Sequence, residues 1–548
     1  MSLKHRILIL IMCLFVLPLS ACSLVKSGPG DALVSEAPGT DFIVVIEDEP
    51  ETCDFQCTTI DYTVAINVFD RLVEMAPNAY GSISVTPSLA EYWSVSADGL
   101  TYRFHLKDGV KFSNGEALTS ADVLYTFKRL LTHPDSHNSE IAALIDGADA
   151  LKSGRSHDLS GFRIINDLDF EIKLTEPFQA FLPCLSMPGA SIIDAASTIL
   201  AGDRFGYDPE YTIGTGPYIF TEWNPGENML FTVNPDCWSG PPKNDGIDMR
   251  FLSEAEEIRA LYKNGKLDIM DLDDVGYYAE YFYRGDIYQE KLFKVQRIAT
   301  TYIALNENIK PLNDVNVRRA MQLALNRPLI LDAVYSGRGL VVDGIYPNGL
   351  IGYDPDIPQI PYDVEEAKKL MAKAGYPDGF DLTVTMNATA TEYDMNVMRI
   401  AAYMWEKIGI KTKITVLPTS EFLKQRGSGK LACYIATWTA DYDDPYNFIN
   451  TFFGTEENTR YRSINYYNTD VMDRIQKVKA VPNRNERLAE YQALERTVVQ
   501  DDAAWIPLYS REHAYLKSDR VESMAHFAVK GLYREVSLKK TAGEEAAK

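Results

Sequence analysis

The sequence lacks the motifs of the common hydrolases and nucleotide-dependent enzymes. It contains neither a GxSxG nucleophile elbow nor an HExxH zinc pair. The run 427-GSGKL-431 lacks the spacing and hydroxyl of a phosphate-binding loop, and 214-GTGPYI-219 lacks the third glycine of a dinucleotide fingerprint. We therefore expect a protein that is not an enzyme and needs no cofactor, with a surface-anchored hydrolase as the alternative from another class.

Basic residues are in deficit. Lys and Arg number 54 against 77 Asp and Glu, which leaves a formal net charge of −23. Because an acidic surface repels phosphate backbones, nucleic acid is excluded as the expected partner. A chain of 548 residues with 46% hydrophobic residues is instead expected to bury two or three packed cores.

Residues that bind metals are sparse. Cys53 and Cys57, in 52-TCDFQC-57, are close enough to bridge in an oxidising compartment, and the sequence leaves that disulfide open. With CxxxC spacing, no histidine nearby and no second cysteine pair, they are a poor zinc site. His133 and His137 flank a proline in the loop-like run HPDSHNSE. We therefore expect no metal site.

The N-terminus has the pattern of an export signal. Basic residues precede 7-ILILIMCLFVL-17, an apolar run too short to span a membrane but suited to a signal peptide. The following 19-LSAC-22 resembles the lipobox of bacterial lipoproteins, in which Cys22 would carry the lipid; a plain signal peptide is the alternative. We expect a signal peptide over 1–21, a tether over 22–40, and a body anchored at the outer face of the cytoplasmic membrane, periplasmic if an outer membrane is present.

The first half of the body is expected to be rich in strands. Residues 42–46 are apolar and β-branched, and 101–106 and 170–174 alternate between apolar and polar residues. Between them, 119-TSADVLYTFKRLL-131 combines a Thr/Ser cap with apolar residues at helical spacing, which predicts an amphipathic helix.

The second half is expected to be an α/β unit. Apolar stripes predict helices over 317–330 and over 363–375, the latter with an Asp cap and a terminal glycine. Predicted elements then alternate: strands over 381–387, 411–417 and 431–438, and helices over 393–408 and 419–427. This order implies parallel strands with right-handed crossovers.

Asp441 follows the last of these predicted strands. Ligands of open α/β sheets gather at the carboxyl ends of parallel strands, so its position makes Asp441 a site candidate. Trp438 and Tyr442 flank this carboxylate, and no cation is evident nearby in the sequence, which suits a cationic ligand group. Asp443 and Asp444 are expected to be solvated turn residues and helix caps.

Several long motifs resemble one known family, the bacterial extracellular solute-binding proteins that serve oligopeptide and dipeptide ABC importers. The motifs, in chain order, are 88-SLAEYWSVSADGLTYRFHLKDGVKFSNGEALTSADVLYTFKRL-130, 213-IGTGPYIF-220, 234-NPDCWSGPPKNDGIDMRF-251, 313-NDVNVRRAMQLALNR-327, 437-TWTADYDDPYNF-448 and 465-NYYNTDVMDRI-475. The resemblance implies a two-lobed α/β clamshell of the type II (cluster C) periplasmic-binding-protein class with an additional satellite domain. It also implies permease and ATPase partners and a monomer that closes on a peptide.

The resemblance further implies roles for individual residues. Asp441 matches the acid that pairs with the free amino terminus of the peptide. Trp438, Thr439 and Ala440 match the strand whose backbone pairs with the peptide main chain. Thr58 and Thr59 match a loop that lies against the ligand in dipeptide-type members, and Arg426 matches an arginine that lines the site of some oligopeptide binders.

One departure leaves peptide length open. Dipeptide-type members place an arginine after the strand matching 381–387 to hold the peptide carboxylate, and 388-ATATEYD-394 offers none. A longer peptide, or another residue in that role, fits this sequence. A non-peptide ligand such as a nickel chelate, haem or an oligosaccharide is the alternative within the family.

The resemblance also implies the domain limits. The first lobe is discontinuous and takes 41–66, 188–298 and 506–540; the satellite domain takes 67–187 and the second lobe 299–505. Residues 541–548 form a tail.

Overall fold

The computed structural model describes residues 42–59, 62–77, 83–524 and 532–539. The predicted signal peptide, Cys22, the tether and the tail lie outside these residues. The described residues belong to one compact unit. Among them, no helix combines the length and the apolar character needed to cross a membrane.

A twelve-stranded mixed sheet is the largest element. Its strands are β1 (Phe42–Glu47), β8 (Tyr218–Asn224), β9 (Asn228–Val233), β10 (Gly246–Phe251), β11 (Ile269–Asp271), β12 (Leu292–Gln296), β13 (Ala299–Leu305), β14 (Gly339–Val341), β15 (Asp381–Asn387), β16 (Lys411–Leu417), β17 (Cys433–Thr439) and β18 (Trp505–Lys517). The order is β16-β15-β17-β13-β18-β11-β1-β10-β9-β8, with β12 and β14 paired to β18 outside this path.

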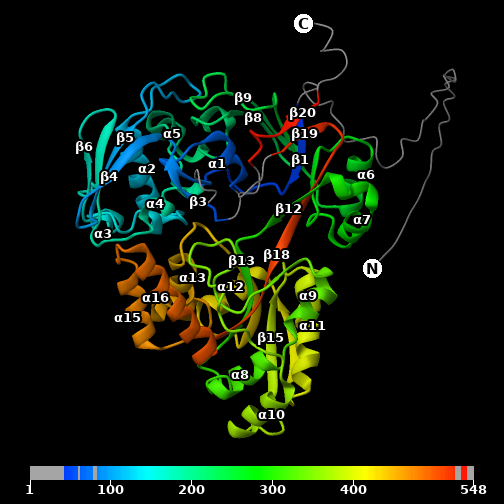
Figure 1. Ribbon diagram of the computed structural model, residues 1–548. Coiled ribbons are helices and arrows are strands. Elements are labelled where there is room, and N and C mark those ends of the chain that lie inside the picture. Colours follow the sequence, from blue (N-terminus) through cyan, green and yellow to red (C-terminus); the bar gives the residue numbers. More distant parts are fainter. Residues whose placement is uncertain (1–41, 60–61, 78–82, 525–531, 540–548) are drawn as a thin grey trace, which may run out of the picture. The chain divides into compact units, whose positions relative to one another are not determined.

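Strand β18 connects the two halves of this sheet (Figure 1). Its first part pairs with β13 and β14 as far as Arg511, and its second part pairs with β11 and β12 from Glu512 onward. Residues 506–511, which the sequence places in the first lobe, therefore pair with strands of the second.

The alternating unit of the second half is confirmed. β15 is parallel to β16 along its whole length and parallel to β17 at Val384 and Cys433. Helices α10 (Val364–Lys373), α11 (Glu392–Glu406) and α12 (Thr419–Gly427) follow the predicted ranges closely. The cap of α10 is also confirmed, because the Asp363 side chain accepts the N–H of Glu366 at 2.9 Å.

The stripe over 317–330 belongs to two helices rather than one. α8 (Val315–Leu323) ends before Ala324, and α9 (Arg327–Tyr335) begins three residues later. The break has a local cause, because the Asn326 side chain accepts the N–H of Leu329 and Pro328, in the first turn of α9, has no N–H of its own.

A separate antiparallel sheet forms in the first half, in the order β4 (Ala90–Val95), β5 (Thr101–Leu106), β7 (Asp169–Lys173) and β6 (Phe162–Ile164). The predicted helix is α2 (Ser120–Thr132), where Thr119 and Asp122 form a capping box. The further elements are α1 (Thr63–Val68), β2 (Val73–Pro77), β3 (Ile83–Pro87), η1 (Ser139–Ile141), α3 (Ala148–Lys152), α4 (Phe181–Cys184), η2 (Pro188–Ala190), α5 (Ala195–Ala201), η3 (Gly202–Arg204), η4 (Pro209–Tyr211), α6 (Ala255–Lys263), η5 (Gly276–Tyr278), α7 (Ala279–Arg284), η6 (Asp286–Lys291), α13 (Tyr446–Phe453), α14 (Glu456–Tyr461), α15 (Thr469–Val478), α16 (Arg484–Arg496), η7 (Thr497–Asp501), β19 (Val521–Ser523) and β20 (Ser537–Leu538).

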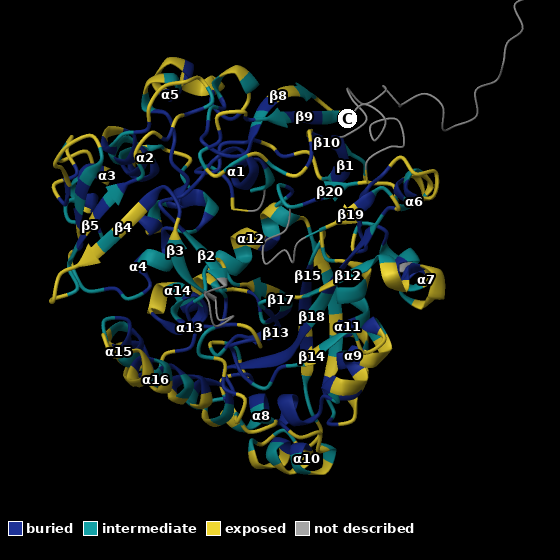
Figure 2. Cartoon of the chain, turned by 45° about the horizontal axis from the view of Figure 1, so that its top comes forward, coloured by how far each residue is buried: buried dark blue, intermediate teal, exposed yellow. Residues whose placement is uncertain are grey.

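The described residues bury four apolar clusters. One draws its residues from 302–509 and a second from 72–192. Two smaller clusters combine residues near the start of the chain with residues after 192 and after 513. Figure 2 shows β13 and β18 largely buried, whereas α10 carries an exposed face. The limits of the lobes and of the satellite domain stay a prediction.

Candidate ligand-binding site at Asp441

Along the carboxyl half of β17, one edge has no paired strand among the described residues. β17 pairs antiparallel with β13 from Cys433 to Thr439, but its pairing with β15 is confined to Cys433. The N–H of Ala440 donates to the carbonyl of Ile298 at 2.8 Å. Since alternate residues of a strand bond to opposite neighbours, the backbone groups of Thr437 and Thr439 point away from β13, where no described strand pairs with them.

This geometry changes which residues can offer backbone bonds to a ligand. Of the three residues singled out by resemblance, Trp438 and Ala440 direct their backbone groups toward β13. Thr439 faces the open edge, and so does Thr437, which the sequence reasoning missed. A period of two along the strand is the signal that would have identified Thr437 once its pairing with β13 was known.

Asp441 lies just past the end of β17 and is held by one side chain of α13. The Asn447 amide donates to Asp441 Oδ2 at 2.8 Å, and the Asp441 N–H donates to Asn447 Oδ1 at 3.0 Å. Asn447 is itself buried and also accepts the indole N–H of Trp438 at 3.2 Å. The Asp441 side chain stays exposed and forms no ion pair with any described Lys or Arg.

The surroundings of Asp441 leave it electrostatically unsatisfied. Desolvation by the surrounding protein raises its pKa, against the hydrogen bond from Asn447 and the charge of Arg462. Burial is the main cause that raises the pKa of Glu140 and the pKa of Tyr62, the latter to about 12. The negative charge of Asp441 raises both further. Two acids, Asp441 and Glu140, therefore come within electrostatic range of each other from distant parts of the chain. A cation between them would relieve both.

Trp438 presents a half-buried ring to a guanidinium. The Arg462 Cζ lies 4.6 Å from the centre of the Trp438 ring, and Phe452 packs edge-on against that ring at 5.6 Å. Arg462 forms no ion pair within the described part of the chain. The sequence reasoning missed Arg462, because nothing in its local pattern distinguishes it from a surface arginine.

Tyr442, which follows Asp441 directly, packs toward the first half of the chain. It packs against the apolar cluster of residues 72–192, and its side chain interacts with the thiol of Cys184. Its role toward a ligand stays a prediction.

The expectation that Asp443 and Asp444 are solvated is wrong for Asp444. Its side chain is 3% exposed and pairs with Arg487 at 2.5 Å, while its other oxygen accepts the N–H of Tyr446 at the start of α13. The helix-capping role is thus confirmed. Asp443 accepts the N–H of Ile351 at 2.6 Å, so it braces a loop.

Thr58 and Thr59 differ in exposure. Thr58 is 8% exposed, and its carbonyl accepts the Tyr62 hydroxyl at 3.0 Å and the Asn138 amide at 2.8 Å. Thr59 is exposed. Because Tyr62 is also within range of Asp441, this loop lies on the same side of the molecule as the candidate site.

Arg426 projects from α12 toward the ring of Tyr461, with 5.5 Å between its Cζ and the ring centre. Its buried Nε has no hydrogen-bond partner within the described residues. Arg462 lies 5.7 Å from the centre of the same ring. The two guanidinium groups therefore gather at one aromatic side chain.

The disulfide left open by the sequence is not formed, because Cys57 is a free thiol. Its sulfur lies 3.2 Å from Asp54 Oδ2 and 3.3 Å from His133 Nδ1. Burial and the Asp54 charge raise the pKa of Cys57 to about 12, which suppresses the thiolate that disulfide formation requires. The expectation that no histidine lies near these cysteines is therefore wrong.

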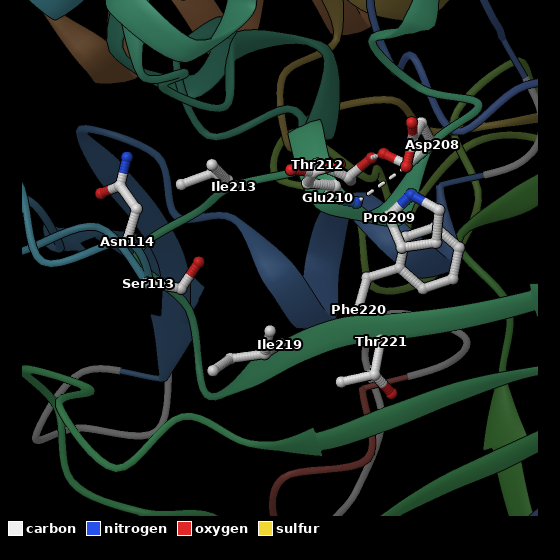
Figure 3. Close-up of a pocket in the computed structure, with 10 residues that line it drawn as sticks. All are labelled: Ser113, Asn114, Asp208, Pro209, Glu210, Thr212, Ile213, Ile219, Phe220 and Thr221. Carbon is white, nitrogen blue, oxygen red and sulfur yellow. Dashed lines mark hydrogen bonds between the residues drawn. The ribbon is translucent and has the colours of Figure 1, made fainter. Parts of the chain in front are cut away.

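A pocket among the described residues lies elsewhere. It has a volume of about 440 Å³ and is lined from η4, from β8 and from Ser113 and Asn114 (Figure 3). None of the expected ligand-binding residues lines it, so we do not assign it to the Asp441 site.

The family model described as "Bacterial extracellular solute-binding proteins, family 5 Middle" matches residues 84–460, more than half of the chain and including β17 and Asp441. The protein belongs to this family. As a family 5 protein it is a solute-binding protein of the bacterial cell exterior, and its function rests on binding.

Two curated relatives cover most of this family 5 chain. The Di/tripeptide-binding protein 1 of Pseudomonas aeruginosa is 30% identical over 455 residues, covering 78% of this chain and 81% of its own. The Heme-binding protein A of Haemophilus influenzae is 28% identical over 453 residues, covering 80% and 81%.

Solved structures confirm the fold. The periplasmic binding protein DppA of Helicobacter pylori, in complex with the peptide STSA, has a TM-score of 0.74 at 24% identity and covers 91% of this chain and 98% of its own. The chain thus has the α/β, type II periplasmic-binding-protein fold expected from its sequence.

Proposed function

We propose that this family 5 protein is an extracytoplasmic receptor that captures peptides by their free amino terminus and delivers them to an ABC importer. The observation that carries the proposal is the state of Asp441. Its carboxylate is exposed, it is held in place by Asn447, and it forms no ion pair with a Lys or Arg among the described residues. The α-ammonium group of a peptide supplies the missing charge.

The open edge of β17 supports an extended peptide as the ligand. The backbone groups of Thr437 and Thr439 lie just before Asp441 and have the orientation that adds a strand to a sheet. A peptide whose amino terminus reaches Asp441 would run along these residues. Main-chain bonding of this kind gives affinity without reading side chains.

The other end of the peptide needs a positive group. We propose Arg426 and Arg462 for it, because both lie against Tyr461 and neither forms an ion pair within the described residues. This assignment would replace the arginine absent from 388–394. The reach between these groups and Asp441 would set the length of the peptide.

We also propose the arrangement in the cell implied by the N-terminal motif. Cys22 would carry the lipid anchor, and the permease and ATPase subunits of an importer would receive the ligand-bound form. The first lobe, the satellite domain and the second lobe would move as bodies about β18, which pairs with strands of both lobes.

The test is direct binding. The purified protein is incubated with a mixed peptide pool and washed, and retained compounds are identified by mass spectrometry. A retained peptide is then made with a free and with an acetylated amino terminus, and the two affinities are compared by calorimetry. We expect the acetylated form to bind at least roughly tenfold more weakly, because it cannot offer a cation to Asp441.

Other outcomes would contradict the proposal. Equal binding of the two forms would place the amino terminus away from Asp441. Retention of haem, a metal chelate or a sugar in preference to any peptide would assign another ligand. Conversion of the pool to shorter peptides would mark a hydrolase.

A further inference from the structure

A cluster of ligating side chains that does not include Asp441 lies near the start of the described residues. The Sγ of Cys57, Nδ1 of His133 and Oδ2 of Asp54 all lie within 4.8 Å of one another. Cys57 and Asp54 belong to the segment before α1, whereas His133 is the residue that ends α2. The fold therefore brings a thiol, an imidazole and a carboxylate together from positions 76 residues apart.

Backbone contacts hold each of these groups in place. The Cys57 N–H donates to the Asp54 carbonyl at 2.9 Å, and the Gln56 N–H donates to Asp54 Oδ1 at 3.1 Å. The His133 N–H continues the bonding of α2 to Arg129 at 2.8 Å. The cluster is therefore largely pre-formed, which lowers the cost of ordering it around an ion.

His133 presents the nitrogen that a metal requires. Its Nδ1 faces the backbone N–H of Asp135 at 3.3 Å, and that N–H can only donate. This contact favours the tautomer with the proton on Nε2, and a metal ion would take the single lone pair of Nδ1 in place of the Asp135 N–H. Cys57 and His133 are both half-exposed, which leaves an entry path and room for water as a fourth ligand.

We propose that Asp54, Cys57 and His133 bind one divalent transition-metal ion, with Zn²⁺ as the best chemical match. A thiolate, an imidazole and a carboxylate are the donor types that zinc takes in tetrahedral sites. Mg²⁺ and Ca²⁺ prefer all-oxygen sites and do not fit this set. Present separations of 3.2 Å and 3.3 Å from sulfur to its two neighbours need little adjustment around a shared ion.

Arg129 is the cation that faces this cluster. Its guanidinium donates to Asp54 Oδ1 at 3.1 Å, to Asp54 Oδ2 at 2.5 Å and to Gln56 Oε1 at 2.7 Å. It orients the carboxylate from outside the site, as partners of ligating groups commonly do. Its charge opposes the incoming ion, whereas the proton that Cys57 loses on forming a metal–thiolate bond offsets part of the added positive charge.

The ion would tie together two parts of the chain with separate cores. Asp54 and Cys57 adjoin the cluster that contains Phe55, whereas α2 packs into the cluster of residues 72–192. Thr58 follows Cys57 directly, so an ion at this position would also fix the start of the loop beside Tyr62.

The test uses Co²⁺ as a spectroscopic probe on the purified protein, prepared without a polyhistidine tag and treated with chelator. We expect a thiolate-to-cobalt charge-transfer band that saturates at one equivalent and disappears when Zn²⁺ displaces the cobalt. Cys57→Ser should abolish the band, and His133→Ala should weaken cobalt binding at least tenfold.

Matched variants serve as controls. Cys237→Ser removes a buried thiol that contacts Ser239, and His137→Ala removes an exposed ring four residues from His133; both should bind cobalt like the unmodified protein. Absence of the band in the unmodified protein overturns the proposal, as does its persistence in Cys57→Ser. The unmodified-protein result stands even if a variant fails to fold.

Discussion

Asp441 and Asp444 lie three residues apart in one turn, yet their environments are opposite. Asp444 is buried, pairs with Arg487 and caps α13. Asp441 is exposed, is held only by an amide and lacks an ion pair within the described residues. The difference teaches that the role of a carboxylate here follows from whether the fold supplies it with a cation. One acid stabilises the fold, and the other is left for a ligand.

The largest expected effect is on the buried member of this comparison. Asp444→Asn keeps the shape of the side chain but leaves the Arg487 charge uncompensated, so we expect the free energy of unfolding to fall by about 3–5 kcal/mol. Chemical denaturation monitored by tryptophan fluorescence measures this. Asp443→Asn is the matched control, and a loss as large in Asp443→Asn would show that any change in this turn is disruptive.

The next effect is on binding. Asp441→Ala should weaken peptide binding by about 2–5 kcal/mol, the range for truncating one partner of a charge pair that binding would bury, and should leave the free energy of unfolding unchanged within error. Calorimetry with a retained peptide measures the first quantity and denaturation the second. If Asp441→Ala destabilises the fold as much as Asp444→Asn, the proposed division of roles is incorrect.

A third acid, Glu495, extends the comparison because a bound proton, and not a cation, neutralises it. Glu495 is 1% exposed; its Oε1 accepts the N–H of Ile345 at 2.5 Å and of Tyr346 at 2.8 Å, and its Oε2 has no partner within the described residues. Burial raises its pKa to about 8, against an ordinary value of 4.5. The folded protein thus holds a proton that the unfolded chain releases.

The sign of the resulting pH effect follows from that proton. Protonated Glu495 contributes to the free energy of unfolding. This contribution is fully present below about pH 4.5 and is lost as pH rises through about 8, at no more than about 1.4 kcal/mol per pH unit. Thermal unfolding measured across this pH range should show the unmodified protein losing stability as pH rises. In Glu495→Gln, whose amide oxygen still accepts both N–H groups, the stability should depend less steeply on pH. If the stability of the two proteins has the same slope against pH, the proton is held by a group other than Glu495.

Local patterns in the sequence predict most of the elements. Capping of α2 by Thr119 and of α10 by Asp363 depends on residues within one turn, and the parallel order of β15, β16 and β17 follows from strand and helix periodicities. The helix over 317–330 was the exception, because its apolar stripe continues past Asn326 while the backbone does not. The position of Asp441 at the end of β17 was also predictable.

By itself, then, the sequence determined the family, the class of fold, the order of elements and the placement of one acid after one strand. Only the tertiary structure decided which backbone edge of β17 stays open, that Arg487 neutralises Asp444 and not Asp441, and that His133 meets Cys57. The physical reason is range. Capping and periodicity act within a few residues, whereas charge pairing, strand registry and the meeting of ligating atoms depend on groups far apart in the chain.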